Sequence, residues 1–287
     1  MTSLPNAAAA GQITLGGDLT VNRLGFGAMR ITGPGVWGDP PDVSAAVRLL
    51  RRAVHLGVNF IDTADAYGPQ VSENLLARAL YPYPPDLVIA TKGGMVRPGP
   101  GAWNRDGRPA HLRAACEASL KRLRIERIAV YQLHAPDPAV PIEESIGELV
   151  RLRAEGKIRH IGVSNVTVDE LERCERLAPV VSVQNRYNLE ERRAEDVLQH
   201  CAARRIAFLP WAPLGSGRQA TQPERQRTLA DVARRRQIST GQAGLAWLLQ
   251  HADMMLPIPG TASMAHLEEN IAAAAVRLSP EELSELA

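Results

Sequence analysis

Short apolar runs recur along almost the whole chain and alternate with amphipathic stretches. The runs are rich in valine and isoleucine and show little polar–apolar alternation, as expected for parallel strands buried on both faces. The predicted strands span Val21–Phe26, Val58–Ile61, Leu87–Ala90, Ile128–Leu133, Ile158–Val163, Val180–Val183, Ile206–Leu209 and Met255–Ile258.

The stretches between these runs place apolar residues three or four positions apart, which predicts helices with one buried face. They span Val43–Leu56, Ser72–Leu80, His111–Leu123, Glu143–Glu155, Val168–Leu177, Glu195–Arg204, Glu224–Arg236, Gln242–His251 and His266–Ala275. Such repeated strand–helix units predict an α/β fold, namely a (β/α)8 TIM barrel, which typically takes about 250 residues. A doubly wound parallel sheet is the alternative fold.

Both ends of the chain add elements to this barrel. Gln12–Leu15 and Leu19–Val21 are β-like runs on either side of a glycine turn, and they predict an N-terminal β-hairpin that can plug the barrel bottom. Ser279 and Pro280 have the pattern of a capped helix start, which predicts an extra C-terminal helix. No linker-like segment separates these elements, so we expect residues 1–287 to form a single barrel domain.

Composition narrows the class of protein. The formal net charge is +2, with 45% hydrophobic and 22% charged residues, which excludes a disordered chain and gives no reason to expect a nucleic-acid or membrane partner. The three cysteines form no CxxC pair or Cys/His cluster, so we expect neither a disulfide framework nor a metal site. Without a signal-peptide or transmembrane pattern, the expected location is cytoplasmic, with no obligate protein partner evident.

Polar side chains stand at the ends of three successive predicted strands. Asp62 and Tyr67 follow the second strand, Lys92 follows the third and His134 follows the fourth. The carboxyl ends of barrel strands meet at one mouth, where catalytic groups sit. We therefore expect these four side chains to lie together.

The chemistry of this set suits carbonyl reduction. Asp62 keeps the Lys92 ammonium charged, and that charge favours the phenolate of Tyr67, which makes Tyr67 a general acid for a carbonyl oxygen. His134 can donate a hydrogen bond to the same oxygen. A cofactor must supply the hydride.

The glycine-rich segment after the first strand resembles a dinucleotide-binding fingerprint, but Arg30 stands where its third glycine is required. A long loop follows instead of a helix, so the fingerprint is rejected. The segment with Gly27 and Met29 is then either a plain glycine-rich loop at the barrel top or a loop whose backbone closely approaches a ligand.

The segment Asp62-Thr63-Ala64-Asp65-Ala66-Tyr67-Gly68, the pair Thr91-Lys92, Leu133-His134 and Gly162-Val163-Ser164-Asn165 resemble the aldo-keto reductases. The resemblance runs from the loop near Gly25 to Asn270. It implies a barrel that binds NADPH across its mouth and uses Asp62, Tyr67, Lys92 and His134 as a catalytic tetrad.

The resemblance also implies a cofactor site. Ser164, Asn165 and Gln184 correspond to residues that bind the nicotinamide carboxamide, and Trp211 corresponds to an aromatic that stacks on the ring. The alternative for Asn165 is a turn or a helix cap before the helix at Val168. The remaining implied cofactor contacts are Gly27, Met29, Leu214, Gly215, Ser216, Gly217, Gly260, Thr261, His266, Glu269 and Asn270. The best-known members carry Lys-Ser and Arg where this chain has Gly260-Thr261 and His266, which leaves NADH possible beside NADPH.

Two tryptophans are candidates for the substrate pocket. Trp37 and Trp103 lie on long barrel-top loops, where they either line an aromatic pocket or pack their own loops. Arg97, Arg105 and Arg108 either favour an anionic substrate or belong to a solvated loop. The similar bacterial subgroup includes enzymes that reduce pyridoxal to pyridoxine with NADPH, so pyridoxal is a candidate among aldehydes and ketones.

Two other functions remain open at this point. A cofactor-sensing regulatory subunit, as some members of the resembled family are, would bind nucleotide with little turnover. A barrel enzyme that forms a Schiff base would use Lys92 as its nucleophile, but it leaves Tyr67, Ser164 and Gln184 unexplained.

Overall fold

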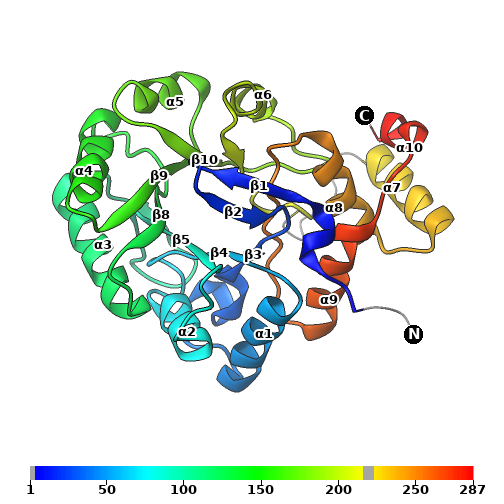
Figure 1. The fold of residues 1–287 in the computed structure, drawn as a ribbon, viewed down its shortest axis with the longest axis horizontal. Helices are drawn as coiled ribbons and strands as arrows, with labels where there is room; N and C mark the ends of the chain where they lie inside the picture. The colour runs from blue at the N-terminus through cyan, green and yellow to red at the C-terminus, as the bar shows by residue number, and fades with distance from the viewer. Residues whose placement is uncertain (1–3, 216–222, 287) are drawn as a thin grey trace.

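The computed structural model describes residues 4–215 and 223–286, and its centre is a curled parallel sheet (Figure 1). Seven strands pair in the order β11-β10-β9-β8-β5-β4-β3. These strands are β3 (Phe26–Gly27), β4 (Phe60–Asp62), β5 (Val88–Gly93), β8 (Ile128–Leu133), β9 (Ile158–Ser164), β10 (Val180–Gln184) and β11 (Ala207–Phe208). Apart from the first and last, six predicted strands recur with small changes of boundary.

The predicted strand Met255–Ile258 is not a regular strand, although its backbone lies where the eighth strand was expected. Leu256 N–H donates to Phe208 O at 2.8 Å, and Gly25 N–H donates to Pro257 O at 2.9 Å. The segment therefore joins β11 to the loop before β3 and closes the barrel. Pro257 and Pro259 have no N–H to donate, which prevents a continuous ladder here.

The first predicted strand, Val21–Phe26, divides into two elements. Its start belongs to β2 (Leu19–Asn22), which pairs antiparallel with β1 (Gln12–Leu15) as the predicted hairpin. The division occurs at Asn22, whose side chain donates to Gly57 O at 2.7 Å and whose N–H donates to the Asn59 side chain at 2.8 Å. The inward side chains of the hairpin join the cluster that fills the barrel interior, which confirms the predicted plug.

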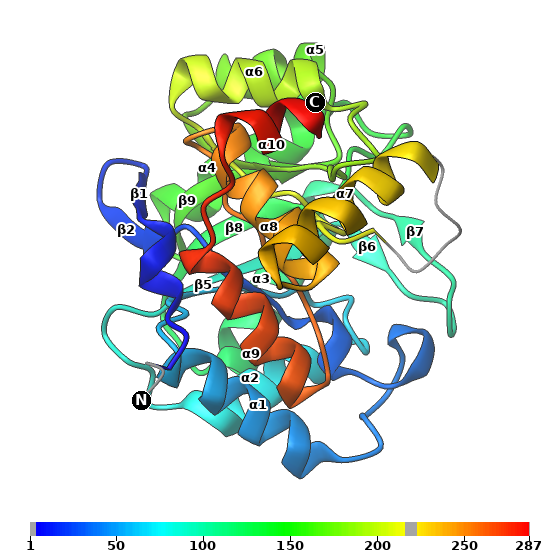
Figure 2. The same ribbon diagram turned by 90° about the vertical axis from the view of Figure 1, so that its right-hand side faces the viewer.

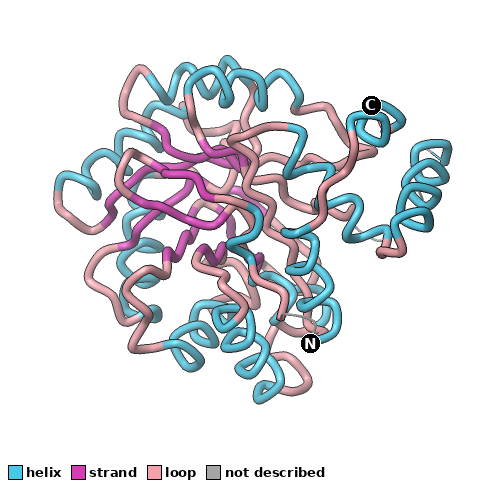
Figure 3. The backbone as a smooth tube through the Cα atoms, turned by 45° about the vertical axis from the view of Figure 1, so that its right-hand side comes forward, coloured by secondary structure: helices cyan, strands magenta, loops and turns pink. Residues whose placement is uncertain are grey.

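Helices surround the sheet (Figure 3). They agree with the predicted set to within a few residues at each end. Their bounds are α1 Val43–His55, α2 Val71–Leu80, α3 Pro109–Leu123, α4 Ile142–Ala154, α5 Val168–Glu175, α6 Glu195–Arg204, α7 Pro223–Arg236, α8 Thr240–His251, α9 Met264–Ala272 and α10 Pro280–Glu285. The predicted extra helix is α10, and Ser279 caps it by accepting from Glu282 N–H.

Two hairpins lie at opposite ends of the barrel (Figure 2). β1 and β2 cover the end where the strands begin. The second hairpin, β6 (Met95–Val96) with β7 (Asn104–Arg105), follows β5 on the side where the strands end. This second end therefore carries the long loops on which a site can be built.

Candidate active site

A cavity of about 470 Å³ opens at the carboxyl ends of the strands. Its floor is polar, whereas its walls are largely apolar and aromatic. The lining residues are Gly27, Met29, Arg30, Val36, Asp62, Tyr67, Met95, Trp103, His134, Ser164, Asn165, Gln184, Trp211, Ala212, Pro213, Leu214, Gly215, Ile258, Pro259 and Gly260. The four side chains predicted at the strand ends are thus brought together, with Lys92 buried beneath the cavity.

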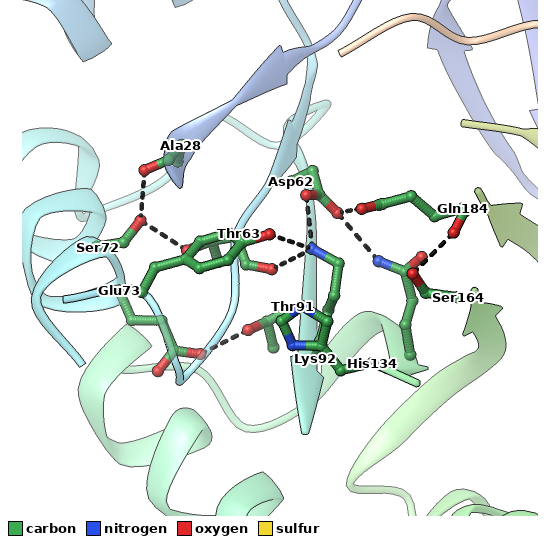
Figure 4. A network of polar contacts seen from close by, with 12 residues as sticks. Ala28, Asp62, Thr63, Ser72, Glu73, Thr91, Lys92, His134, Ser164 and Gln184 are labelled. Carbon is green, nitrogen blue, oxygen red and sulfur yellow. Dashed lines mark hydrogen bonds and ion pairs between the residues drawn. The ribbon is translucent and has the colours of Figure 1, made fainter. Parts of the chain in front are cut away.

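Lys92 is the centre of the polar floor (Figure 4). Its fully buried ammonium donates to Asp62 Oδ2 at 2.6 Å, to Thr63 O at 2.9 Å and to Tyr67 OH at 3.3 Å. The Tyr67 ring meets the His134 ring edge to face, with centroids 5.8 Å apart. An ammonium has three donor hydrogens, so these three contacts use all of them.

Asp62 also holds two side-chain amides through its second carboxylate oxygen. Oδ1 accepts from Gln184 Nε2 at 2.8 Å (Figure 4). It also accepts from Gln132 Nε2 at 3.0 Å. The parallel register pairs Lys92 with Gln132 on the neighbouring strand, which explains why Gln132 reaches the same carboxylate. Gln132 was not among the predicted site residues. Its place two residues before His134 in a buried strand is the signal that could have found it.

Burial sets the protonation states of the site. It raises the pKa of Tyr67, and this effect outweighs the nearby Lys92 charge, so the phenol stays protonated at neutral pH. Burial alone would lower the pKa of Lys92, but Asp62 and Tyr67 raise it above its ordinary value. Burial and the Lys92 charge lower the pKa of His134 well below its ordinary range. The site therefore holds an acid, a fixed cation and a neutral imidazole.

The protonated state of Lys92 argues against the hypothesis that this residue forms a Schiff base with the substrate. A Schiff base requires a neutral amine. Lys92 keeps its proton and is enclosed by Asp62, Thr63 and Tyr67. The open wall of the cavity presents Tyr67 and His134 instead.

Asp65, in the same turn as Tyr67, lies where burial and a neighbouring acid disfavour the ionised form of its carboxyl group. Burial and the neighbouring Glu73 raise its pKa to about 8 from an ordinary 3.8, and its Oδ1 atom is buried with no hydrogen-bond partner in the described part of the chain. Between these two pH values the unfolded chain loses this proton and the folded chain keeps it. Stability is therefore lost as pH rises through this window.

Asp65→Asn is expected to stabilise the fold, and more so at pH 8 than at pH 5. The increase in the free energy of unfolding should be larger at pH 8 than at pH 5 by an amount on the order of 3 kcal/mol. The reason is that each pH unit over which the folded and unfolded chains differ in protonation costs about 1.4 kcal/mol. Urea unfolding of both proteins at both pH values measures it. A gain of equal size at the two pH values would mean that Asp65 is ionised in the folded protein.

A row of hydrogen-bonded polar groups continues from His134 along the cavity lining. Asn165 adopts a left-handed backbone (φ 59°); its Nδ2 donates to His134 O and its Oδ1 accepts from Trp211 Nε1, both at 3.0 Å. Ser164 Oγ donates to Gln184 O at 2.7 Å. The cap of α5 is Thr167, so Asn165 is not that helix cap, whereas its left-handed backbone is typical of a turn residue. The row joins the floor of the cavity to the exposed Trp211 loop.

Comparison with known proteins identifies the family. The sequence model of the protein family described as the aldo/keto reductase family matches residues 23–287 of this chain. The chain belongs to this family. An uncharacterized oxidoreductase of Schizosaccharomyces pombe is 48% identical over 99% of this chain and 92% of its own length. Pyridoxine 4-dehydrogenase of Escherichia coli is 41% identical over 94% of this chain and 95% of its own length.

Solved structures agree with this assignment. An aldo/keto reductase from Klebsiella pneumoniae in complex with NADP and acetate superposes with a TM-score of 0.81 and 28% sequence identity, covering 96% of this chain and 93% of that one. Family and fold together confirm the predicted TIM barrel and the prediction of an NAD(P)H-dependent oxidoreductase.

Several predicted contacts lie away from the cavity of this aldo/keto reductase. Trp37 pairs with Gly68 in an isolated bridge and lies beneath Arg97, so it packs against two neighbouring loops and does not line the cavity. Four others lie beyond the cavity wall, at the start of and within α9; they are Thr261, His266, Glu269 and Asn270. The predicted Ser216 and Gly217 lie outside the described residues.

Other lining residues were not predicted, namely Arg30, Val36, Met95, Ala212, Pro213, Ile258 and Pro259. Arg30 directly follows Met29 in the glycine-rich loop, which is the signal that could have found it. Met95 lies just beyond β5, behind two glycines.

Within residues 4–215 and 223–286, no group of three or more His, Cys, Asp or Glu side chains is placed to hold a metal ion. No helix in the same ranges has the length and apolar character that crossing a membrane requires.

Proposed function

We propose that this aldo/keto reductase reduces an aldehyde to its alcohol with NADPH, and that pyridoxal is its substrate. The observation that carries the reaction is the 3.3 Å contact between Tyr67 OH and the fully buried Lys92 ammonium on the cavity floor. The identity to a pyridoxine 4-dehydrogenase over nearly the full length of both chains supports the substrate.

The side chains divide the work of protonation. Tyr67, protonated at neutral pH, donates its proton to the substrate oxygen as negative charge develops there. Lys92 stabilises the resulting phenolate, and Asp62 holds the ammonium in place at 2.6 Å. Neutral His134 carries one N–H, which can donate to the same oxygen.

The residues present fit a nicotinamide dinucleotide. When bound, this cofactor supplies the hydride that the substrate carbon receives. Ser164, Asn165 and Gln184 place hydroxyl and amide groups beside the floor, as recognition of a carboxamide requires. Trp211 adds an aromatic side chain at the edge of the same row. Arg30 adds a cation to the cavity lining, and no carbonyl or carboxylate of the described residues holds its guanidinium.

Turnover of pyridoxal tests the proposed function. We expect purified protein to consume NADPH and pyridoxal in equal amounts and to form pyridoxine. If other aldehydes react and pyridoxal does not, the proposed substrate is wrong. If NADPH binds tightly and no carbonyl compound in a broad panel is reduced, the chain is a cofactor-sensing regulatory subunit and not a reductase.

Arg30→Met is expected to weaken NADPH binding by about tenfold to a hundredfold, because a hydrogen bond to a charged group contributes about 1.5–3 kcal/mol. Quenching of tryptophan fluorescence on titration with NADPH and with NADH measures this loss. An equal loss for both cofactors places Arg30 on the diphosphate, and a loss for NADPH alone places it on the 2′-phosphate. Arg48→Met serves as control because Arg48 lies on α1, outside this cavity. Unchanged binding in Arg30→Met would exclude Arg30 from the cofactor site.

A further inference from the structure

Arg97 follows β6 and connects three loops around the cavity. Its Nε atom donates to Ala102 O at 2.7 Å, and Nη2 donates to Gly35 O at 3.0 Å. Nη1 donates to Val36 O at 2.8 Å and to Ala66 O at 3.1 Å. A guanidinium has five donor hydrogens, so at least four of them are directed at backbone carbonyls.

The flat face of the same guanidinium lies on Trp103. Arg97 Cζ is 3.7 Å from the centroid of the Trp103 ring. Trp103 in turn meets Tyr67 edge to face at 6.4 Å and His134 at 6.3 Å, and it lines the cavity. Arg97 thus contacts both the backbone next to Tyr67 and the indole that packs against the two side chains facing the substrate.

This arrangement decides between the two sequence readings of Arg97. An arginine that recognises an anionic substrate needs free donors aimed into the pocket. The donors of Arg97 are directed at carbonyls and its face is covered by Trp103. The other two arginines of this loop also have protein partners, since Arg105 donates to Pro136 O and Arg108 pairs with Asp106.

We propose that Arg97 is a positioning residue that holds Trp103 as the substrate-side wall of the cavity, and that this wall selects flat aromatic aldehydes over small aliphatic or anionic ones. The proposal rests on the proposed reductase function. The loop between β6 and Trp103 contains the run Pro98-Gly99-Pro100-Gly101, which has no regular secondary structure to fix the indole. A Trp ring stacked on a guanidinium and lying beside Tyr67 offers a flat apolar surface to an aromatic ring.

Substrate discrimination in variants tests this role. For Arg97→Met we expect kcat/KM for benzaldehyde to fall about tenfold relative to propanal, through a higher KM for benzaldehyde. Trp103→Leu should show the same loss, and the double variant should lose no more than Trp103→Leu alone, because both changes remove one wall. The Kd for NADPH should stay within about twofold, since the contacts of Arg97 and Trp103 with described residues include none of the predicted cofactor residues.

Arg277→Met is the matched control. Arg277 also donates to three backbone carbonyls, those of Ala274, Val276 and Ala9, but it lies outside the cavity. The Arg277→Met protein should keep the wild-type ratio of kcat/KM for benzaldehyde to kcat/KM for propanal. A parallel assay with 4-carboxybenzaldehyde addresses the anion-binding reading, because that reading predicts a preference for this substrate that Arg97→Lys retains and Arg97→Met loses.

Three results would overturn the role of Arg97. They are an equal loss toward benzaldehyde and propanal, additive losses in the double variant, or the preference for 4-carboxybenzaldehyde just described. If Arg97→Met does not fold, Arg97→Lys takes its place, because an ammonium cannot replace the planar guanidinium that bonds three loops and stacks on Trp103; the same loss toward benzaldehyde is then expected, and an unchanged preference would overturn the role. Absence of turnover in the wild-type protein would instead count against the proposed function, so the two failures are distinguishable.

Discussion

Tyr67→Phe is expected to lower kcat by about 10²- to 10⁴-fold, the usual contribution of a positioned general acid. The substitution removes only the phenolic hydroxyl. The ring keeps its contacts with Trp103 and His134, and Lys92 keeps Asp62 and Thr63 as partners. NADPH binding, measured by fluorescence titration, should therefore be nearly unchanged while steady-state turnover is lost.

Tyr83→Phe is the control for this substitution. Tyr83 also donates its hydroxyl within the protein, to Leu123 O at 2.8 Å, but it does not line the cavity. Removal of the Tyr83 hydroxyl should leave kcat within about twofold of the wild-type value, because no reacting group is affected. A Tyr67→Phe protein that retains a tenth or more of the wild-type kcat would exclude Tyr67 as the acid.

Asp62→Asn is expected to lower the free energy of unfolding by about 3–5 kcal/mol, because it leaves the Lys92 ammonium buried without its counter-charge. For a chain of this size the loss corresponds to a fall in melting temperature on the order of 10 °C. The same change should abolish turnover, since the ammonium no longer has its anchor beside Tyr67. Thermal and urea unfolding measure the stability term.

The double variant Asp62→Asn/Lys92→Met separates stability from catalysis. Removing both buried charges should recover much of the lost stability, whereas turnover should remain absent. Glu285→Gln is the control for a surface pair: Glu285 meets Arg235 at 2.6 Å in an exposed position and should contribute less than about 1 kcal/mol. A double variant no more stable than Asp62→Asn would show that the buried pair is not the source of the loss.

The parts of the fold that depend on local pattern were predictable from sequence. Strand and helix periodicity located the barrel units, and the shared mouth of parallel strands brought Asp62, Lys92 and His134 together. The exception at Met255–Ile258 also has a local cause, since two prolines remove the donors that a ladder requires. Its apolar residues resemble those of a strand, and the backbone still closes the barrel by isolated hydrogen bonds.

The parts of the site that depend on long-range contacts were not predictable. Gln132 is an inward residue of a strand, and only the register between β5 and β8 aims it at Asp62. Arg97 looked like a candidate anion ligand because its acceptors, on three separate loops, are not visible in the sequence. The net pKa of Tyr67 likewise depends on burial, which outweighs the Lys92 charge that the sequence suggested.

Hydride transfer within this cavity can be followed with an isotope. NADPH carrying deuterium at the transferable C4 position is incubated with pyridoxal and the wild-type protein, and the product is analysed by mass spectrometry. We expect one deuterium on the carbinol carbon of pyridoxine and none in product formed without protein. Tight NADPH binding with no deuterated alcohol from pyridoxal or from benzaldehyde would show that this chain does not act as a carbonyl reductase.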